Sequence, residues 1–179
     1  MTRVGLGIAS ALVVALLFVL ARSFGRDPHE VPFGLEKKPA PNFRLRPLDG
    51  GTELQLQALR GKPVVINFWA SWCNPCAAEH AVLEWGAERF GTSTHFLGIV
   101  FEDTRENALG FLREYGTRFT QLEDPRSKTA VDFGVAGVPE TYFVDADGII
   151  RSKHVGPIPV DTLVKRVEEL QASAGASSR

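Results

Sequence analysis

The sequence of 179 residues predicts an α/β domain in which helices flank a mixed central sheet. Three observations support this prediction. Short apolar runs alternate along the chain with segments of helical periodicity, as in βαβ units. The last two expected strands are joined by the tight turn Ala146-Asp147-Gly148, so they must be antiparallel and the sheet must be mixed. The composition, with 44% hydrophobic and 23% charged residues, is that of a globular protein.

The N-terminus stands apart from this domain. Val4 to Ala21 contains no charged residue and would span about 27 Å as a helix, which is just enough for the hydrocarbon core of a bilayer. The run is longer than the apolar core of about 7 to 15 residues in a cleaved signal peptide, which favours an anchor. Val19-Leu20-Ala21 loosely fits a cleavage site, so cleavage stays open. We therefore expect a transmembrane anchor or uncleaved signal over residues 1–22.

The rest of the chain divides into a linker, a domain and a tail. Residues 23–38 contain proline, glycine and mixed charges without periodicity, as in a linker. A globular domain is expected over 39–172, and the small polar residues 173–179 are expected to form a flexible tail. The formal net charge of -1 gives no basic surface for nucleic acid.

The first half of the domain is expected to contain two strands and a helix. Phe43 and Leu45 alternate with polar residues in a short strand over 42–48. Lys62 to Ala70 is almost continuously apolar, which is typical of a strand buried on both faces. Residues 74–90 follow as a helix with an apolar stripe.

The second half continues the alternation. Residues 94–102 form a second buried strand, and the next helix is expected between a cap at Thr104 and a stop at Gly116. Residues 124–134 suggest a shorter helical turn. The remaining expected elements are strands over 139–145 and 148–156 and a closing amphipathic helix over 159–172.

The two cysteines of the chain, Cys73 and Cys76, permit three uses. A closed zinc site needs four ligands, and only His80 stands near enough in sequence to add a third. A structural disulfide would close a very short loop and remove little chain entropy. A copper or zinc metallochaperone that uses the two cysteines and His80 therefore stays only as an alternative.

The redox use has a physical basis in the local sequence. Cys73 follows a buried strand directly, and Pro75 suits the first turn of a helix. The free N–H groups and the positive end of the helix dipole then face the Cys73 sulfur and favour its thiolate, which is the nucleophile. Cys76 lies one turn further on and can resolve a mixed disulfide.

Two segments of the sequence resemble those of a known protein family. "NFWASWCNPC" is similar to the active-site strand, turn and helix of the thioredoxin superfamily, and "GVPETYFVDADGIIRSKHVG" is similar to its cis-proline loop and hairpin. With the N-terminal apolar run, the chain resembles the membrane-anchored, extracytoplasmic proteins of cytochrome c maturation (the DsbE/CcmG, ResA and TlpA type). The resemblance covers roughly residues 39–170, and the insert before Pro139 leaves room for an extra strand and helix.

The resemblance implies roles for the residues at matching positions. Cys73 would be the exposed, attacking thiol, and Cys76 the buried, resolving thiol of a redox-active disulfide. Pro139 would be cis and would place the Val138 backbone where an extended substrate can pair with it. Trp72 would pack over the disulfide.

Two acidic residues complete the implied site. Glu79 matches the buried acid of this group and would exchange a proton with a cysteine if burial raises its pKa. Glu140 would shape an acidic substrate groove. Thioredoxin itself has a buried aspartate where this chain has Asn67, which cannot transfer protons, so Glu79 is the natural substitute.

The cysteine pair and the resemblance together imply a thiol:disulfide oxidoreductase without a cofactor or a bound metal. The resemblance also implies that it is anchored in the inner membrane with its domain on the periplasmic side. Its expected substrates are disulfides of apocytochrome c or of a cytochrome c maturation factor. A membrane thiol-transfer protein of the CcdA/DsbD type would regenerate it. The alternative with the same chemistry is a general extracytoplasmic reductase of the TlpA type, which serves copper-site or other cysteines.

Overall fold

The computed structural model describes residues 8, 11–18 and 34–177 of the chain. It divides into two compact units, residues 1–30 and 31–179. In the first unit, residues 11–18 are helical and their side chains are exposed. No helix within the described ranges is both long and apolar enough to cross a membrane. Most of the predicted anchor, residues 1–22, lies outside the described residues.

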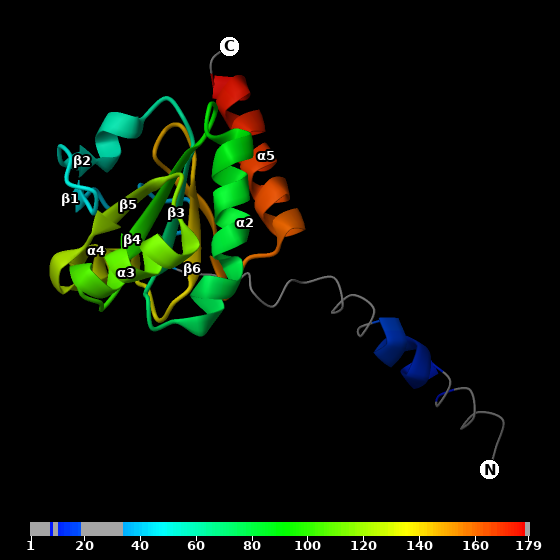
Figure 1. Ribbon diagram of the computed structural model, residues 1–179. Coiled ribbons are helices and arrows are strands. Elements are labelled where there is room, and N and C mark those ends of the chain that lie inside the picture. The colour runs from blue at the N-terminus through cyan, green and yellow to red at the C-terminus, as the bar shows by residue number, and fades with distance from the viewer. Residues whose placement is uncertain (1–7, 9–10, 19–33, 178–179) are drawn as a thin grey trace. The chain divides into compact units, whose positions relative to one another are not determined.

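The second unit is built on a seven-stranded sheet, as far as the described residues show (Figure 1). The strand order is β2-β1-β5-β4-β3-β6-β7, so the strand that precedes the cysteines has neighbours on both sides. The β3–β4 and β4–β5 pairs are parallel and the other pairs are antiparallel, which confirms the mixed sheet. The strands are β1 (Arg44–Pro47), β2 (Leu54–Gln55), β3 (Val64–Trp69), β4 (His95–Val100), β5 (Thr120–Glu123), β6 (Glu140–Val144) and β7 (Ile150–Val155).

Helices cover both faces of this sheet, and the alternation of side chains along β3 shows which face each helix covers. Val65 and Trp69 point to the face that packs against α2, α3 and α5. Ile66 and Phe68 point to the opposite face, which packs against α4 and η1. The helices are α2 (Asn74–Phe90), α3 (Arg105–Tyr115), α4 (Lys128–Phe133) and α5 (Val160–Ser177), with short 3₁₀ segments η1 (Leu56–Leu59) and η2 (Pro125–Ser127).

Helix ends agree well with the sequence prediction. The predicted helix 74–90 matches α2, and the Thr104 hydroxyl accepts a hydrogen bond from the Asn107 N–H to cap α3. Gly116 ends α3 with a φ of 81°, a conformation that favours glycine. One expectation was wrong: α5 continues past residue 172 to Ser177, so most of the expected flexible tail is helical.

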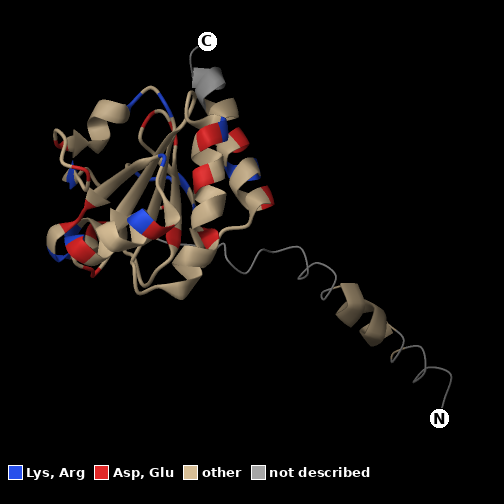
Figure 2. Ribbon diagram, in the orientation of Figure 1, with Lys and Arg blue, Asp and Glu red and all other residues tan. Residues whose placement is uncertain are grey.

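The domain begins earlier than Pro39, where the linker was expected to end. The Lys37 N–H donates to the Ile150 carbonyl at 2.8 Å, and the Ala40 N–H donates to the Gly148 carbonyl at 2.9 Å. Leu35 packs against the apolar core. These residues therefore belong to the fold. Figure 2 shows acidic and basic residues interspersed along its helices and loops.

Candidate redox active site

The cysteine pair lies where β3 passes into α2. Cys73 caps the helix: its Sγ accepts a hydrogen bond from the Cys76 N–H at 3.1 Å. Pro75 occupies the first turn, where a missing N–H costs no helical hydrogen bond. Cys73 and Cys76 form a disulfide with an S–S distance of 2.05 Å. The Cys73 sulfur therefore lies in the field of the helix N-terminus, as the sequence predicts.

Both cysteines are buried in this oxidised form. Cys73 is 4% exposed and Cys76 is 3% exposed, so the expectation of an exposed Cys73 beside a buried Cys76 is wrong. They share an apolar cluster with Trp69 and Phe111, which comes from α3. Helix α3 therefore contributes to the walls around the disulfide.

The loop before β6 closes the site from the other side. The Val138–Pro139 peptide bond is cis, as the resemblance implied. The Val138 carbonyl oxygen lies 3.6 Å from the Cys73 Sγ. Because β3 and β6 are adjacent antiparallel strands, with Phe68 opposite Glu140, the cysteine turn and the cis-proline loop meet at one edge of the sheet.

Glu79 lies three residues after Cys76 on α2 and is 2% exposed. Burial raises its pKa from 4.5 to about 7, against the opposing effect of hydrogen bonds from the Ile158 N–H and the Asn67 side chain. These two donors lie 2.8 Å from Oε2 and 2.8 Å from Oε1, respectively. The structure therefore places a carboxyl group that titrates near neutral pH one helical turn from Cys76.

Asn67 joins three elements at this point. Its Nδ2 on β3 donates to Glu79 on α2 at 2.8 Å and to the Thr141 hydroxyl on β6 at 3.1 Å. An aspartate at this position has no proton to donate when it is ionised. Asn67, which replaces the aspartate of thioredoxin, thus orients the carboxyl group of Glu79.

Glu140 differs from its expectation. It was expected to shape a substrate groove, but it is 1% exposed and its carboxylate lies in the interior. It pairs with Lys153 at 3.1 Å and accepts a hydrogen bond from the Ala136 N–H at 3.2 Å. Both faces of β6 are buried, so a side chain at position 140 lies in the interior, on the same face as Tyr142.

Trp72 lies at the surface, directly before Cys73. Its ring is 56% exposed, and its Nε1–H donates to the Glu102 carbonyl at 3.1 Å, whereas Trp69 is the tryptophan in the apolar cluster of the cysteines. Trp72 forms part of the wall of a cavity of about 650 Å³ beside the site. Other residues of that wall are Glu102, Asp103, Arg105, Asp124 and Arg126.

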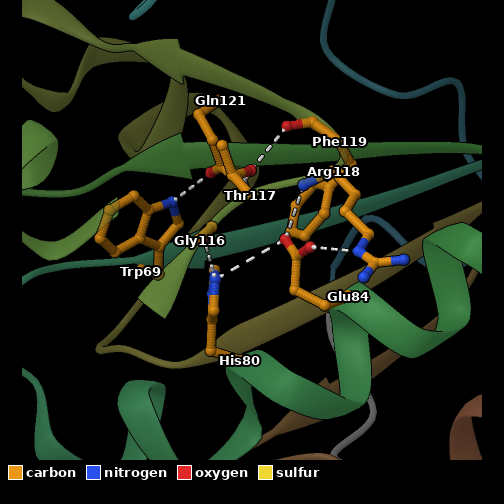
Figure 3. A network of polar contacts seen from close by, with 8 residues as sticks. All are labelled: Trp69, His80, Glu84, Gly116, Thr117, Arg118, Phe119 and Gln121. Atoms are coloured by element: carbon orange, nitrogen blue, oxygen red, sulfur yellow. Dashed lines mark hydrogen bonds and ion pairs between the residues drawn. The ribbon is translucent and has the colours of Figure 1, made fainter. Parts of the chain in front are cut away.

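His80 points toward Gly116 and Glu84 (Figure 3). Its Nε2–H donates to the Gly116 carbonyl at 2.8 Å, and the same nitrogen lies 3.6 Å from the Glu84 carboxylate. Within the part of the chain that the structure describes, no three histidine, cysteine or acidic residues are arranged to hold a metal ion. This geometry does not support the metallochaperone alternative.

Trp69 is fixed by a buried side chain that the sequence did not point to. Its Nε1–H donates to the Gln121 Oε1 at 2.9 Å, and Gln121 in turn donates to the Thr117 hydroxyl at 3.1 Å (Figure 3). Lys153 was missed as well. Its burial depends on the pairing that sets Lys153 opposite Tyr142, which the sequence of β7 does not reveal.

Comparison with known proteins agrees with this geometry. The AhpC/TSA family matches residues 37–153. The thiol:disulfide interchange protein DsbE of Allochromatium vinosum is 41% identical over 169 residues, which is 93% of this chain and 90% of that protein. The thiol:disulfide interchange protein HelX of Rhodobacter capsulatus is 41% identical over 166 residues, 90% of this chain and 93% of that protein.

Solved structures show the same likeness. A secreted Mycobacterium tuberculosis disulfide oxidoreductase, homologous to DsbE of Escherichia coli, aligns with a TM-score of 0.65 and 28% identity, and the match covers 72% of this chain and 96% of that one. The fold, the CxxC disulfide at the start of α2 and these relatives agree with one another. The chain therefore belongs to the AhpC/TSA family and, within it, to the DsbE-type thiol:disulfide interchange proteins.

Proposed function

We propose that this chain reduces disulfides of apocytochrome c, or of a partner in cytochrome c maturation, outside the cytoplasm. The observation that supports the proposal best is the meeting of Cys73 with the cis-proline loop. The sulfur at the start of α2 lies 3.6 Å from the Val138 carbonyl, where an extended polypeptide can pair with the backbone. A family of thiol:disulfide interchange proteins and a buried acid one helical turn from Cys76 fit the same chemistry.

The exchange proceeds in two steps. The thiolate of reduced Cys73 attacks one sulfur of the substrate disulfide, and the other substrate sulfur leaves as a thiolate. Cys76 then loses its proton and attacks the Cys73 sulfur, which releases the second substrate thiolate. The substrate gains two electrons and the cysteine pair loses two, which leaves the Cys73–Cys76 disulfide of this structure.

Glu79 is the group that we assign to the proton of Cys76. With a pKa of about 7, its carboxyl group is partly ionised at neutral pH, so it can accept that proton and later return it. The bonds from Asn67 and Ile158 hold both of its oxygens in place. Trp72, Val138 and Pro139 are then the surface on which the substrate polypeptide rests.

The proposed location rests on the N-terminal apolar run for the anchor and on the family resemblance for the side of the membrane. The apolar run Val4 to Ala21 would anchor the chain once in the inner membrane, with the thioredoxin-like domain on the periplasmic side. Reduction of substrates consumes the dithiol, so a membrane thiol-transfer protein of the CcdA/DsbD type would restore it. Fractionation of cells that express the full chain tests the location, because an anchored chain stays with membranes after a salt wash.

Substitution Cys76→Ser tests the assignment of roles. Without the resolving thiol, the mixed disulfide between Cys73 and the substrate is expected to persist. Mass spectrometry of adducts from the membrane fraction would then name the partner. Adducts with proteins that contain a Cys-x-x-Cys-His sequence support cytochrome c maturation, whereas adducts with copper-site proteins support the general reductase.

The matched control is Cys73→Ser in the same background, which should abolish every adduct. Adducts that survive in that control would contradict the roles given to the two cysteines. The direction of electron flow needs its own measurement, the reduction potential of the pair. A potential well below that of the compartment agrees with a reductant, and a strongly oxidising potential would contradict it.

A further inference from the structure

A second buried polar cluster lies on the face of β6 opposite to Glu79. The Lys153 Nζ lies 3.1 Å from the Glu140 Oε2, and the two side chains are 8% and 2% exposed. Tyr142, which stands opposite Lys153 in the β6–β7 pairing, brings its hydroxyl oxygen to 2.8 Å from the same carboxylate oxygen. Two polar groups thus converge on one buried carboxylate oxygen.

The charge of Glu140 depends on Lys153. A buried carboxylate that has no cation beside it costs several kcal/mol and takes up a proton instead. The titratable groups that face Glu140 within the described residues are Tyr142 on its own strand and Lys153 on β7, while β3 and α4 contribute the apolar rings of Phe68 and Phe133. Lys153 is therefore the positive charge that keeps this carboxylate ionised.

Tyr142 does not take over that role. Its hydroxyl oxygen lies 2.8 Å from Glu140 and 3.1 Å from the Phe133 carbonyl, and its single proton can serve only one of them at a time. Burial, and then the negative charge of Glu140, raise the pKa of Tyr142, so the hydroxyl keeps its proton. The tyrosine stays neutral and supplies no charge.

The other oxygen of Glu140 holds the substrate-facing loop. Oε1 accepts a hydrogen bond from the Ala136 N–H at 3.2 Å. Ala136 stands two residues before Val138, whose carbonyl lies 3.6 Å from the Cys73 sulfur. A hydrogen bond to an ionised acceptor is stronger than a hydrogen bond to a neutral one. The charge on the Glu140 carboxyl group therefore decides how firmly this loop is held.

We propose that Lys153 is a positioning residue for disulfide exchange. By keeping Glu140 ionised, it fixes the loop of residues 134–139, so that the Val138 backbone is ready to pair with a substrate beside Cys73. The inference rests on the proposed function for its link to exchange. In this proposal Lys153 and Glu140 affect substrate binding through the loop, and neither side chain touches the substrate.

Substitution Lys153→Met in the full chain tests this role. A buried carboxyl group that has lost its cation should favour the neutral form, so the loop should loosen. At pH 6, KM for a peptide with a Cys-x-x-Cys-His disulfide should then rise about fivefold while kcat changes little. Higher pH favours the charged form, so KM should return toward that of the unsubstituted chain as the pH rises. Hydrogen exchange of the Ala136 amide should be faster than in the unsubstituted chain at pH 6 and approach it at higher pH.

Two variants serve as controls. Lys153→Arg keeps the positive charge and should keep both the KM and the Ala136 exchange rate. In the double variant Glu140→Gln/Lys153→Met the titrating group is absent, so the raised KM should no longer depend on pH. A pH dependence that persists in the double variant would show that another group is responsible, and it would overturn the proposal.

The structural alternative gives a different result. If Lys153→Met melts at a lower temperature but keeps the KM profile and Ala136 exchange of the unsubstituted chain, Lys153 only stabilises the hairpin and the proposal is wrong. Failure of the proposed function is recognised separately, because the unsubstituted chain would then not reduce the peptide. In that case Ala136 exchange still decides whether the ion pair holds the loop.

Discussion

At the scale of single residues, the site depends on how two carboxyl groups are buried. Glu79 is buried with two hydrogen-bond donors and no cation within the contacts that the structure records, and its pKa rises to about 7. Glu140 is buried with Lys153 as its counter-ion. The first arrangement suits a group that must exchange a proton, and the second suits a group whose charge must not change.

The raised pKa of Glu79 predicts a pH-dependent stability. Between pH 4.5 and about 7, the native chain keeps a proton that the unfolded chain releases. The free energy of unfolding should therefore fall as the pH rises through this range, by roughly 3 kcal/mol. Urea unfolding of Glu79→Gln should lack this fall, although the variant starts about 1–3 kcal/mol less stable because an amide cannot accept from both donors.

The exposed residue Glu114 on α3 provides the control for this measurement. Glu114→Gln should keep the pH dependence of the unsubstituted chain. If Glu79→Gln shows the same dependence as Glu114→Gln, the titrating group lies elsewhere and Glu79 is not the proton acceptor that we assign to Cys76.

Asn67→Asp tests the orienting role of the amide. The variant loses the donor to Glu79 and Thr141 and places a second carboxyl group 2.8 Å from the first. Two carboxyl groups at this distance cannot both ionise easily, so we expect a loss of at least about 2 kcal/mol at pH 8 and a smaller loss at pH 5. Asn42→Asp at an exposed position is the matched control for urea unfolding. A loss that is equal at both pH values would contradict the prediction.

The sequence predicts such residues when they stand close to a motif along the chain. Glu79 follows Cys76 by one helical turn, so the helix alone places it near the cysteines. Glu140 stands beside Pro139, but its burial depends on Lys153, which reaches it only through the register of β6 and β7. A contact made by strand pairing has no local signal, and for that reason the sequence suggested a surface acid.

At the scale of elements, the active-site strand is held through its neighbours. Trp69 at the end of β3 is fixed by Gln121 of β5, and the Gln121 side chain crosses β4 at Gly98. A Cβ atom at Gly98 would lie 1.9 Å from the Gln121 Oε1. The glycine therefore leaves the space through which β5 reaches β3.

This crossing predicts coupling between positions 98 and 121. Gly98→Ala should displace Gln121, leave the Trp69 N–H without its acceptor and cost about 2–3 kcal/mol in urea unfolding. In the Gln121→Ala background the clash with Gln121 is removed and the Trp69 Nε1, 2.9 Å from the added Cβ, is the remaining close contact. The same substitution should therefore cost at least about 1 kcal/mol less. Equal costs in the two backgrounds would show that Gly98 matters only for its backbone.

Long elements were predicted well and short ones were not. The α2 and α3 helices have caps and periodic apolar residues that identify their ends. By contrast, β5 and β2 are too short to show a pattern, and β5 has the sequence TQLE, in which the buried Gln121 looks like a surface residue. Its burial depends on Trp69, which lies on a non-adjacent strand.

At the scale of the whole molecule, the chain N-terminal to β1 completes the domain. Pro39 bridges to Ile149, and the N–H groups of Lys37 and Ala40 bond to the hairpin region, while Leu35 packs on the core. This segment reaches the end of β6 and the start of β7 that lie away from Pro139. It therefore stabilises the hairpin that holds Glu140 and Lys153.

Two truncated chains test that contribution. A chain of residues 34–179 should unfold in urea with the free energy of the domain in the full chain. A chain of residues 42–179 lacks these bonds and the packing of Leu35, so it should be about 2–3 kcal/mol less stable. Equal stability of the two fragments would place the start of the domain after residue 41.

Alternating residues of strand β6 contribute to two different polar clusters, one on each face of the sheet. Glu140 and Tyr142 serve the cluster with Lys153, while Thr141 between them serves the cluster with Asn67 and Glu79. A substitution in this strand alters one cluster, but the loss or gain of one residue would exchange its two faces and destroy both clusters together. Evolution of this strand is therefore restricted to substitutions, and changes of length among homologues should accumulate in turns such as 146–148.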